Sequence, residues 1–274
     1  MIFRVLIEDT NGTVPVVCEH GLSVYVETKK HRYLMDTGAS EKTFQNADVL
    51  GISVTDVDAV VLSHGHYDHT GGMMPLVERG YRGPVFLRSN ANLPYYNLKE
   101  YEKYIGIDQQ IMSLPGLQLT GESGITKVNE ELSLFSGVNG TRMLPPGNVT
   151  LYEKKDGTFV PDVFSHEQYA VLWEDGKSIL VSGCAHKGIL NILARYKELY
   201  GTYPDAVISG FHMMKAEGYD ERDVIGIRAV SEELLGTGIQ FFTGHCTSVP
   251  AYEIMKPVMG EKLLYFHAGD MIEI

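Results

Sequence analysis

A strand that ends in a cluster of potential metal ligands limits the folds open to this chain. The apolar run at 57–62 predicts a strand covered on both faces, and His64-Gly65-His66-Tyr67-Asp68-His69 follows almost at once. A solvated turn would account for one or two histidines, but not for so many ligands in a chain with 10 histidines. We therefore expect this loop to bind metal.

The spacing within the motif indicates two ions. His64 and His66 alternate, so an extended turn directs both side chains at one ion. Asp68 and His69 lie on the next bend and can reach a second position nearby. Imidazole nitrogen and carboxylate oxygen suit zinc and, at similar geometry, iron or manganese. The motif thus predicts two divalent metal ions, with zinc favoured.

Two ions need more ligands than the motif supplies, and these must come from distant parts of the sequence. Polar residues at strand-to-loop junctions of the second half are the candidates: His166, Cys184, His186, His212 and His245. The stretch 58–64 also resembles 205–212, and both are apolar strands that end in a histidine. Two similar halves that direct side chains to a common seam would explain this likeness.

Periodicity predicts an alternation of strands and helices. Strands are expected at 1–8, 21–28, 32–35, 57–62, 84–88, 116–120, 131–135, 169–173, 178–182, 206–209, 240–243, 263–266 and 271–274, and helices at 41–50, 73–79, 187–200, 221–235 and 250–259. The segment 92–112 is predicted to be a helical insertion or a loop, and the Gly- and Pro-rich segment 136–150 a long loop. We expect one domain over 1–274, with an insertion around 92–150.

The composition of the chain limits the kinds of partner that it is expected to bind. The chain has 274 residues, of which 44% are apolar, and a formal net charge of −12. An acidic body does not attract nucleic acid or anionic membrane, so neither is expected as a partner. A small anionic substrate stays open, because bound divalent cations invert the local field. A monomer or a homodimer is expected.

The compartment follows from what the sequence lacks. The first residues do not have the pattern of a signal peptide, and no apolar run reaches the roughly 18 residues of a membrane span. The cysteines number 3 and are far apart, so they do not form a disulfide framework. A cytoplasmic location is the expectation.

With these residues in view, the chain resembles the metallo-β-lactamase superfamily. The resemblance rests on Asp36-Thr37-Gly38, the motif at 64–69, His166, Gly183-Cys184 and His245. A narrower resemblance is to a subfamily whose members are labelled as a dihydropterin-related phosphate synthase or as metal-dependent hydrolases. It rests on residues 183–188, 210–212 and 244–247. The resemblance implies an α/β fold, a four-layer αβ/βα sandwich of two mixed β-sheets with outer helices and metals at one edge.

The resemblance also implies roles. His64 and His66 would bind one ion with a third ligand, for which His166 is a candidate. The other ion would be bound by Asp68, His69 and His245. Asp36 would orient one of these ligands through a hydrogen bond.

The sequence departs from the family pattern where a bridging aspartate usually stands. Cys184 is there instead, with His186 two residues later, and either can be the ligand. A cysteine would make the site softer and favour zinc. His186 is also a candidate for substrate contact or catalysis.

Other residues are assigned to the substrate. His212 is expected to contact substrate or to donate a proton, and Asp68 to steer a proton beside the metals. His20, in a Cys-Glu-His-Gly turn, is expected to border the pocket. Arg142, in the long loop, is a candidate clamp for an anionic group.

The expected function is metal-dependent hydrolysis or group transfer on a small phosphate-containing molecule. Two close divalent ions lower the pKa of a shared water from about 15.7 towards about 7, which supplies a hydroxide as nucleophile. The subfamily label implies displacement of pyrophosphate from a dihydropterin derivative. No Gly-X-Ser-X-Gly, Gly-X-Gly-X-X-Gly or Walker loop occurs, so neither a serine nucleophile nor a nucleotide cofactor is indicated.

Three alternatives stay open. The same chemistry would hydrolyse a carboxylic ester, thioester or lactone. A di-iron redox protein is disfavoured, because His66 stands where that variant of the fold has a carboxylate. A non-catalytic metal-binding sensor is the last alternative, although such proteins usually lose a ligand of the motif.

Overall fold

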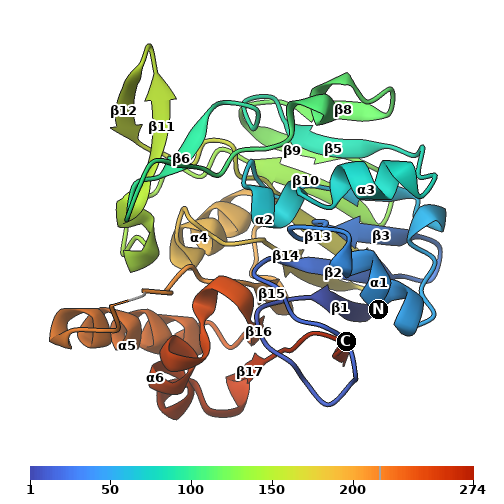
Figure 1. Cartoon of the computed structure of the whole chain (residues 1–274). Coiled ribbons are helices and arrows are strands. Elements are labelled where there is room, and N and C mark those ends of the chain that lie inside the picture. The colour runs from blue at the N-terminus through green and yellow to red at the C-terminus, as the bar shows by residue number, and fades with distance from the viewer. Residues whose placement is uncertain (216) are drawn as a thin grey trace.

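The computed structural model describes residues 1–215 and 217–274, which form two seven-stranded sheets, a smaller third sheet and helices on the outside (Figure 1). The helices are α1 (Lys42–Val49), α2 (Tyr67–Thr70), α3 (Met73–Glu78), α4 (Ile189–Tyr200), α5 (Glu221–Gly236) and α6 (Val249–Met259). No helix of the described ranges is both long and apolar enough to cross a membrane.

The first sheet is built mainly from the N-terminal half. Its order is β18 (Met271–Glu273), β1 (Ile2–Ile7), β2 (Ser23–Glu27), β3 (Arg32–Met35), β4 (Ala59–Val61), β5 (Val85–Arg88) and β8 (Leu117–Thr120). Strands β3, β4, β5 and β8 run parallel, while β18, β1, β2 and β3 pair antiparallel. The sheet is therefore mixed, as predicted.

The second sheet repeats this plan with the C-terminal half. Its order is β17 (Leu263–Tyr265), β16 (Gln240–Thr243), β15 (Ala206–Ser209), β14 (Lys177–Val181), β13 (Tyr169–Glu174), β10 (Leu132–Ser136) and β9 (Gly124–Lys127). Strands β14, β15, β16 and β17 run parallel and the others pair antiparallel. The carboxyl ends of β4 and β15 thus occupy similar places in the two sheets, as the likeness of 58–64 to 205–212 predicts.

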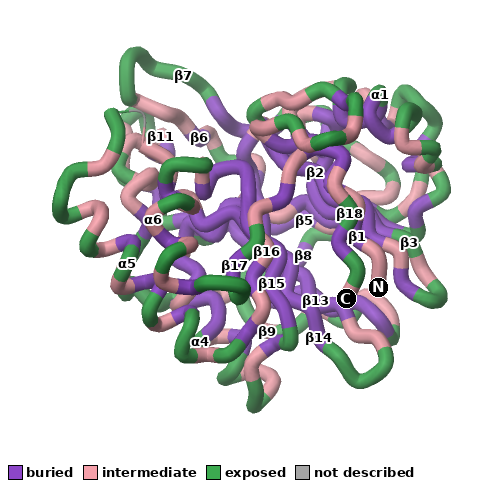
Figure 2. The backbone as a smooth tube through the Cα atoms, turned by 90° about the horizontal axis from the view of Figure 1, so that it is seen from below, coloured by how far each residue is buried: buried purple, intermediate pink, exposed green. Residues whose placement is uncertain are grey.

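Three apolar clusters hold the layers together. The inner cluster joins the two sheets and includes Phe3, Val24, Leu134, Ile179 and Ile208. A second cluster packs α4, α5 and α6 on the outer face of the second sheet, and a third packs α1 and α3 on the first. In Figure 2 the buried segments run along the strands of both sheets. This arrangement confirms the predicted four-layer αβ/βα sandwich.

The insertion differs from the prediction. Residues 92–112 contain no α-helix; they form β6 (Tyr95–Asn97), β7 (Lys103–Tyr104) and a 3₁₀ turn at Gln109–Ser113. Strands β6 and β7 join β11 (Leu151–Lys155) and β12 (Thr158–Pro161) in a four-stranded sheet that stands out from the sandwich (Figure 1). These strands are short, so a sequence pattern cannot identify them, and the sheet depends on the pairing of β6 with β11, which are distant in sequence.

Candidate metal centre

Loops that follow the ends of neighbouring strands bring the candidate ligands to one edge of the sandwich. The motif loop follows β4, the loop with Cys184 and His186 follows β14, and His245 follows β16. Parallel strands end at the same edge, so residues far apart in sequence meet there. Four non-glycine residues at this edge have a positive φ, as strained residues of functional sites often do: Asp36, Ala185, His212 and His245.

Three imidazoles converge on the first position. The Nε2 atom of His64 lies 3.1 Å from Nδ1 of His66 and 3.4 Å from Nε2 of His186. All three side chains are buried. The structure therefore joins His186 to the histidine pair of the motif.

Four side chains surround the second position. The Nε2 atom of His69 lies 3.2 Å from Nε2 of His245 and 3.0 Å from Sγ of Cys184. A carboxylate oxygen of Asp68 lies 3.4 Å from Nε2 of His245. The possible ligand atoms of all four residues lie within 4.8 Å of one another, and all four residues are buried.

Cys184 belongs to both positions. Its sulfur also lies within 4.8 Å of a ring nitrogen of His64 and of His186. The cysteine thus stands between the two groups, where sequence analysis placed either Cys184 or His186. The geometry separates these two residues, because His186 contacts the first group and Cys184 is shared.

Hydrogen bonds fix the orientation of four of the imidazoles. His69 and His245 each donate Nδ1–H to a carboxylate, that of Asp36 at 2.6 Å and that of Asp9 respectively. His186 donates Nδ1–H to the amide oxygen of Asn148 at 3.0 Å. Such outer bonds choose the tautomer and leave Nε2 free for a metal.

The fourth imidazole, His64, is held through a relay. The hydroxyl of Ser63 donates to Asp36 at 2.7 Å, so its oxygen accepts Nδ1–H of His64 at 2.8 Å. The Ser63 backbone N–H also donates to Asp36. Asp36 therefore contacts His69 directly and His64 through Ser63, the position that its predicted orienting role requires. Ser63, Asp9 and Asn148 were not foreseen.

This arrangement fits a bound cation. Burial, reinforced by neighbouring imidazoles, holds the pKa of His64 and His186 well below the usual value, so both rings are neutral. Each donates its one N–H outwards, and two inner Nε2 lone pairs then face each other at 3.4 Å with no hydrogen between them. A cation between the nitrogens turns this repulsion into coordination.

The second group also favours positive charge. Burial alone would lower the pKa of His245, but the Cys246 sulfur and the carboxylates of Asp9 and Asp68 outweigh it. They hold that pKa well above the usual value. A proton or a metal ion at the inner nitrogen satisfies this field, and a donor set of sulfur, imidazole and carboxylate suits zinc.

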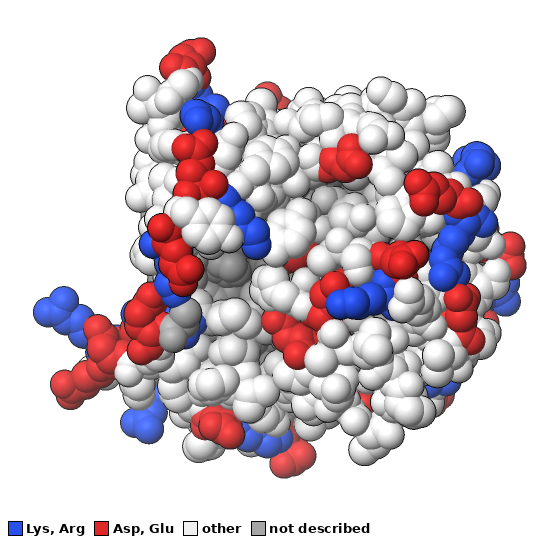
Figure 3. Space-filling view, viewed as in Figure 1, with Lys and Arg blue, Asp and Glu red and all other residues white. Residues whose placement is uncertain are grey.

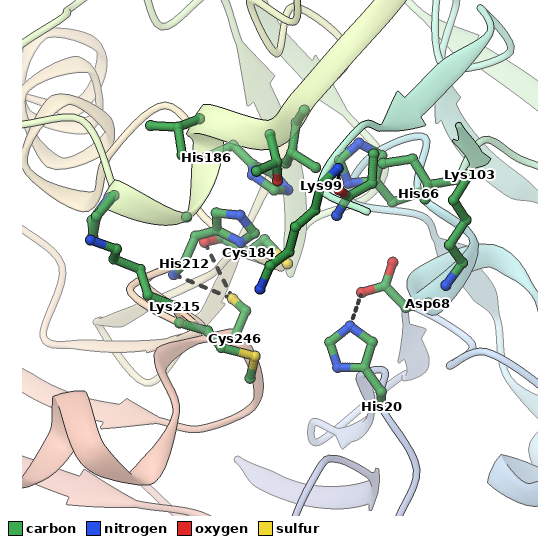
Figure 4. Close-up of a pocket in the computed structure, with 18 of the residues that line it drawn as sticks. His20, His66, Asp68, Lys99, Lys103, Cys184, His186, His212, Lys215 and Cys246 are labelled. Atoms are coloured by element: carbon green, nitrogen blue, oxygen red, sulfur yellow. Dashed lines mark hydrogen bonds and ion pairs between the residues drawn. The ribbon is translucent and has the colours of Figure 1, made fainter. Parts of the chain in front are cut away.

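A cavity of about 290 Å³ opens onto these residues. Its walls include His66, Asp68, Cys184 and His186 from the candidate metal-ligand groups, together with Cys246, and also the predicted substrate residues His20 and His212. In Figure 4 these side chains surround one space, and Figure 3 shows a hollow in this face with basic side chains on its rim.

Three lysines, which sequence analysis missed, also line the cavity: Lys99, Lys103 and Lys215. Lys103 donates to the Tyr67 hydroxyl at 3.0 Å and has no carboxylate partner among the described residues. Lys99 forms an ion pair with exposed Glu217. The ammonium ends of Lys99 and Lys103 point towards the cavity (Figure 4).

Comparison with known proteins places the chain. The family model of the Metallo-beta-lactamase superfamily matches residues 16–82. A 7,8-dihydropterin-6-methyl-4-(beta-D-ribofuranosyl)-aminobenzene-5'-phosphate synthase from Methanocaldococcus jannaschii is 31% identical over 297 residues, which cover 98% of this chain and 95% of the relative. The chain belongs to the metallo-beta-lactamase superfamily.

Two further relatives cover the full chain. An uncharacterized protein of Methanocaldococcus jannaschii is 25% identical over the whole of both sequences. The crystal structure of a metal-dependent hydrolase of the beta-lactamase superfamily has a TM-score of 0.83 and 28% identity, and covers 100% of this chain and 99% of its own. The superfamily and fold predicted from sequence are thereby confirmed. Membership and a full-length relative named as an enzyme also support an enzyme.

Within this metallo-beta-lactamase fold, the His166 ring lies beside that of His66, with centroids 5.1 Å apart, but its nitrogens are bonded to other protein groups. Its Nδ1 accepts the Gly65 backbone N–H at 3.0 Å, so its Nε2 carries the proton and donates to Asp162 at 3.0 Å. Both ring nitrogens are thus occupied by protein partners. His66, Asp162 and His166 do bring ligand atoms within 4.8 Å of one another, but only by giving up these bonds.

Arg142 is not brought to the cavity. Its guanidinium forms an ion pair with Glu233, and its side chain is largely exposed. The long loop instead contributes Pro146, Gly147 and Val149 to the wall. The cations that sequence analysis sought in this loop are supplied by the lysines of the inserted sheet, together with Lys215.

Close packing at the motif leads to a stability prediction. A Cβ on Gly65 would lie 2.3 Å from the backbone oxygen of Ala91, which cannot move away cheaply. We expect Gly65→Ala to lower the free energy of unfolding by about 2–4 kcal/mol in chemical denaturation. Gly226, in the middle of α5 with nothing within 4 Å of the added atom, is the matched control.

Gly226→Ala should instead raise the free energy of unfolding by about 0.5–1 kcal/mol, because alanine has the higher helix propensity. Equal stability of Gly65→Ala and the unmodified protein would show that the motif loop does not pack against the Ala91 backbone.

Proposed function

We propose that this protein is a hydrolase or transferase that uses two divalent metal ions on a small phosphate-bearing substrate. The proposed first ion is bound by His64, His66 and His186, and the second by Asp68, His69 and His245. Cys184 is the shared ligand in place of a carboxylate. When bound, the ions would polarise the substrate and activate a water molecule.

Two observations support this ligand set. The inner nitrogens of His64 and His186 face each other without a proton, as expected of ligands of one ion. The ring nitrogens of His166 are both engaged by Gly65 and Asp162, so we propose His186 rather than His166 as the third ligand. A sulfur ligand favours zinc over iron or manganese.

The observation that carries the substrate class is the set of cavity lysines. The chain has a net charge of −12, yet Lys99 and Lys103 line the cavity beside the ligands, as does Lys215, whose ammonium is paired with Asp223. The pair of Lys99 with exposed Glu217 is weak, so an anionic group can displace it. The relative from Methanocaldococcus jannaschii has phosphate and dihydropterin in its name. A dihydropterin-related phosphate compound is therefore the leading candidate.

Residues beside the ligands have proposed roles in proton transfer and positioning. The Nδ1 atom of His212 is buried without a hydrogen-bond partner among the described residues, and its ring lies 4.0 Å from that of His186. We assign it to substrate contact and to protonation of the leaving group. Asp68 lies 3.5 Å from Nε2 of His20, a path for a proton towards the open side of the cavity.

A substrate panel with lysine variants tests this proposal. Metal-replete protein should turn over phosphate esters or diphosphates faster than carboxylic esters, thioesters and lactones. Lys99→Ala and Lys103→Ala should each lower kcat/KM by about 10- to 100-fold on the phosphate substrate, because each removes a charge-assisted hydrogen bond. Lys155→Ala is the control, since Lys155 is an exposed residue on β11 that does not line the cavity.

Other outcomes of the panel favour other functions. Turnover of carboxylic esters that is insensitive to both lysine variants would favour the ester hydrolase, for which the apolar wall formed by Ile105, Val149, Leu151 and Met214 is suited. No turnover of any compound by protein with full metal content would favour a non-catalytic sensor.

A further inference from the structure

We propose that Cys184 and Cys246 form a reversible disulfide that disables the metal centre when a peroxide enters the cavity. The disulfide itself is inferred from the geometry of the two cysteines. Only its effect on metal binding rests on the proposed function. Cys246 is a member of neither ligand group, so coordination of the two proposed ions does not explain why its sulfur lies beside Cys184.

The two thiols lie close together at the wall of the cavity. Their sulfur atoms and a ring nitrogen of His212 lie within 4.8 Å of one another. The Cys246 thiol is also 3.6 Å from the backbone oxygen of Cys184. Both cysteines are 2% exposed and both line the cavity, so only small molecules that enter it can reach them. Figure 4 shows the two sulfurs on the same side of this space.

The scaffold brings the sulfurs together across an intervening strand. Cys184 follows β14 and Cys246 follows β16, with β15 between them. Next-but-one strands are about 10 Å apart, beyond the reach of a disulfide, so the two loops must turn towards each other. Gly210, just after β15, makes this possible. A Cβ there would lie 2.4 Å from Cys246 Sγ and 3.6 Å from Cys184 Cα.

The His212 backbone also holds the sulfur in place. Its N–H donates to Cys246 Sγ at 3.3 Å, and this residue has a positive φ of 49°. The strained backbone of His212 would cost stability without return if the cysteine that it contacts merely filled space. The third cysteine, Cys18, is partly exposed and lies outside this cluster, so it serves as an internal control.

The oxidation balances with hydrogen peroxide as the oxidant. The Cys246 sulfur attacks one peroxide oxygen, the O–O bond breaks, and a sulfenic acid and one water form. The Cys184 sulfur then displaces the hydroxyl group from that sulfenic acid, which forms the S–S bond and releases a second water. In sum, two thiols lose two hydrogens and two electrons, and one peroxide becomes two waters. A dithiol reductant reverses the step.

The consequence for the metals follows from the place of Cys184. Its sulfur belongs to both ligand groups, and the thiolate form is what binds a metal. A disulfide sulfur has lost that charge, so each ion would lose the shared ligand at once. We expect metal affinity to fall by at least about 100-fold, the upper range for loss of a residue that supports a ligand.

Peroxide treatment followed by peptide mapping tests the inference. Metal-free and metal-loaded protein are treated with hydrogen peroxide, free thiols are alkylated, and cross-linked peptides are identified. A peptide that links residues 184 and 246 is expected in the unmodified protein and in Cys18→Ser, but not in Cys246→Ser. In the loaded protein, a colorimetric chelator should detect released metal, and reduction should restore metal binding.

Two results would overturn the inference: unchanged thiol content of the metal-free protein, or cross-links confined to Cys18. The peroxide treatment of metal-free protein remains informative even if Cys246→Ser does not fold, because the cross-link is looked for in the unmodified chain. Failure of the proposed function looks different. If the protein never binds metal, the proposed metal centre is wrong, yet peroxide would still link residues 184 and 246.

Discussion

His186→Ala is expected to reduce the metal content from about two ions per chain to about one and to lower turnover on the order of 10³-fold. The reason is geometric: the His186 Nε2 atom faces that of His64 at 3.4 Å, and its ring is held by Asn148. Loss of one of three imidazoles leaves too few ligands to hold the first ion. Elemental analysis and steady-state kinetics measure both effects.

His166→Asn is the matched control for that variant. The asparagine oxygen can still accept the Gly65 backbone N–H, which is the bond that His166 makes in the structure. We expect its metal content to stay near two per chain. The opposite pattern, with one ion lost in His166→Asn and none in His186→Ala, would return His166 to the role of third ligand.

Removal of the metals should lower the melting temperature by roughly 10–20 °C. Two ions, each held at about 1,000 times its dissociation constant, stabilise the fold by about 4 kcal/mol each, and each kcal/mol moves Tm by about 2 °C in a large domain. The effect is large here because neutral imidazoles such as His64 and His186 stay buried with opposed lone pairs once the cation leaves.

Differential scanning calorimetry before and after dialysis against a chelator measures this shift. Addition of zinc to the dialysed protein should restore the original Tm, which separates metal loss from damage. An unchanged Tm in protein that elemental analysis shows to have lost its metal would mean that these side chains do not need a cation for stability.

The strands of the sandwich were predicted because they are strongly apolar, whereas the sandwich itself followed from the family resemblance. The run at 57–62 and its counterpart at 206–209 both became buried parallel strands that end at the same edge. The inserted sheet was not predicted. Its strands are short, and its centre is the pairing of β6 with β11, which joins residues distant in sequence and which no local pattern records.

Some residues of the candidate site could likewise be predicted from the sequence and others could not. Ligand-type residues packed into one short motif are visible from the sequence alone. Asp9 and Asn148 are not, because they act by hydrogen bonds to histidines 236 and 38 residues away in sequence. One signal for Asp9 existed. Glu8 and Asp9 come directly after β1. A ligand-type side chain just after a strand end is the criterion that selected His245, and Asp9 meets it too.

The choice between Cys184, His186 and His166 depended on geometry that spacing cannot supply. Cys184 and His186 alternate after one strand and both reach the first group, but only Cys184 also reaches the second, and Ala185 between them adopts a positive φ of 55°. The cavity lysines were hidden for a similar reason. Lys99 and Lys103 lie in a polar insertion, and only the pairing of β6 with β7 and β11 turns them towards the site.

The most direct test of the metal centre is an anomalous-difference map from crystals of protein purified without added metal. We predict two peaks that share Cys184 Sγ, each at about 2.3 Å from it if the metal is zinc. One should be bound by His64, His66 and His186, and the other by Asp68, His69 and His245. No peak, or a single peak between His66, Asp162 and His166, would contradict the two-metal centre.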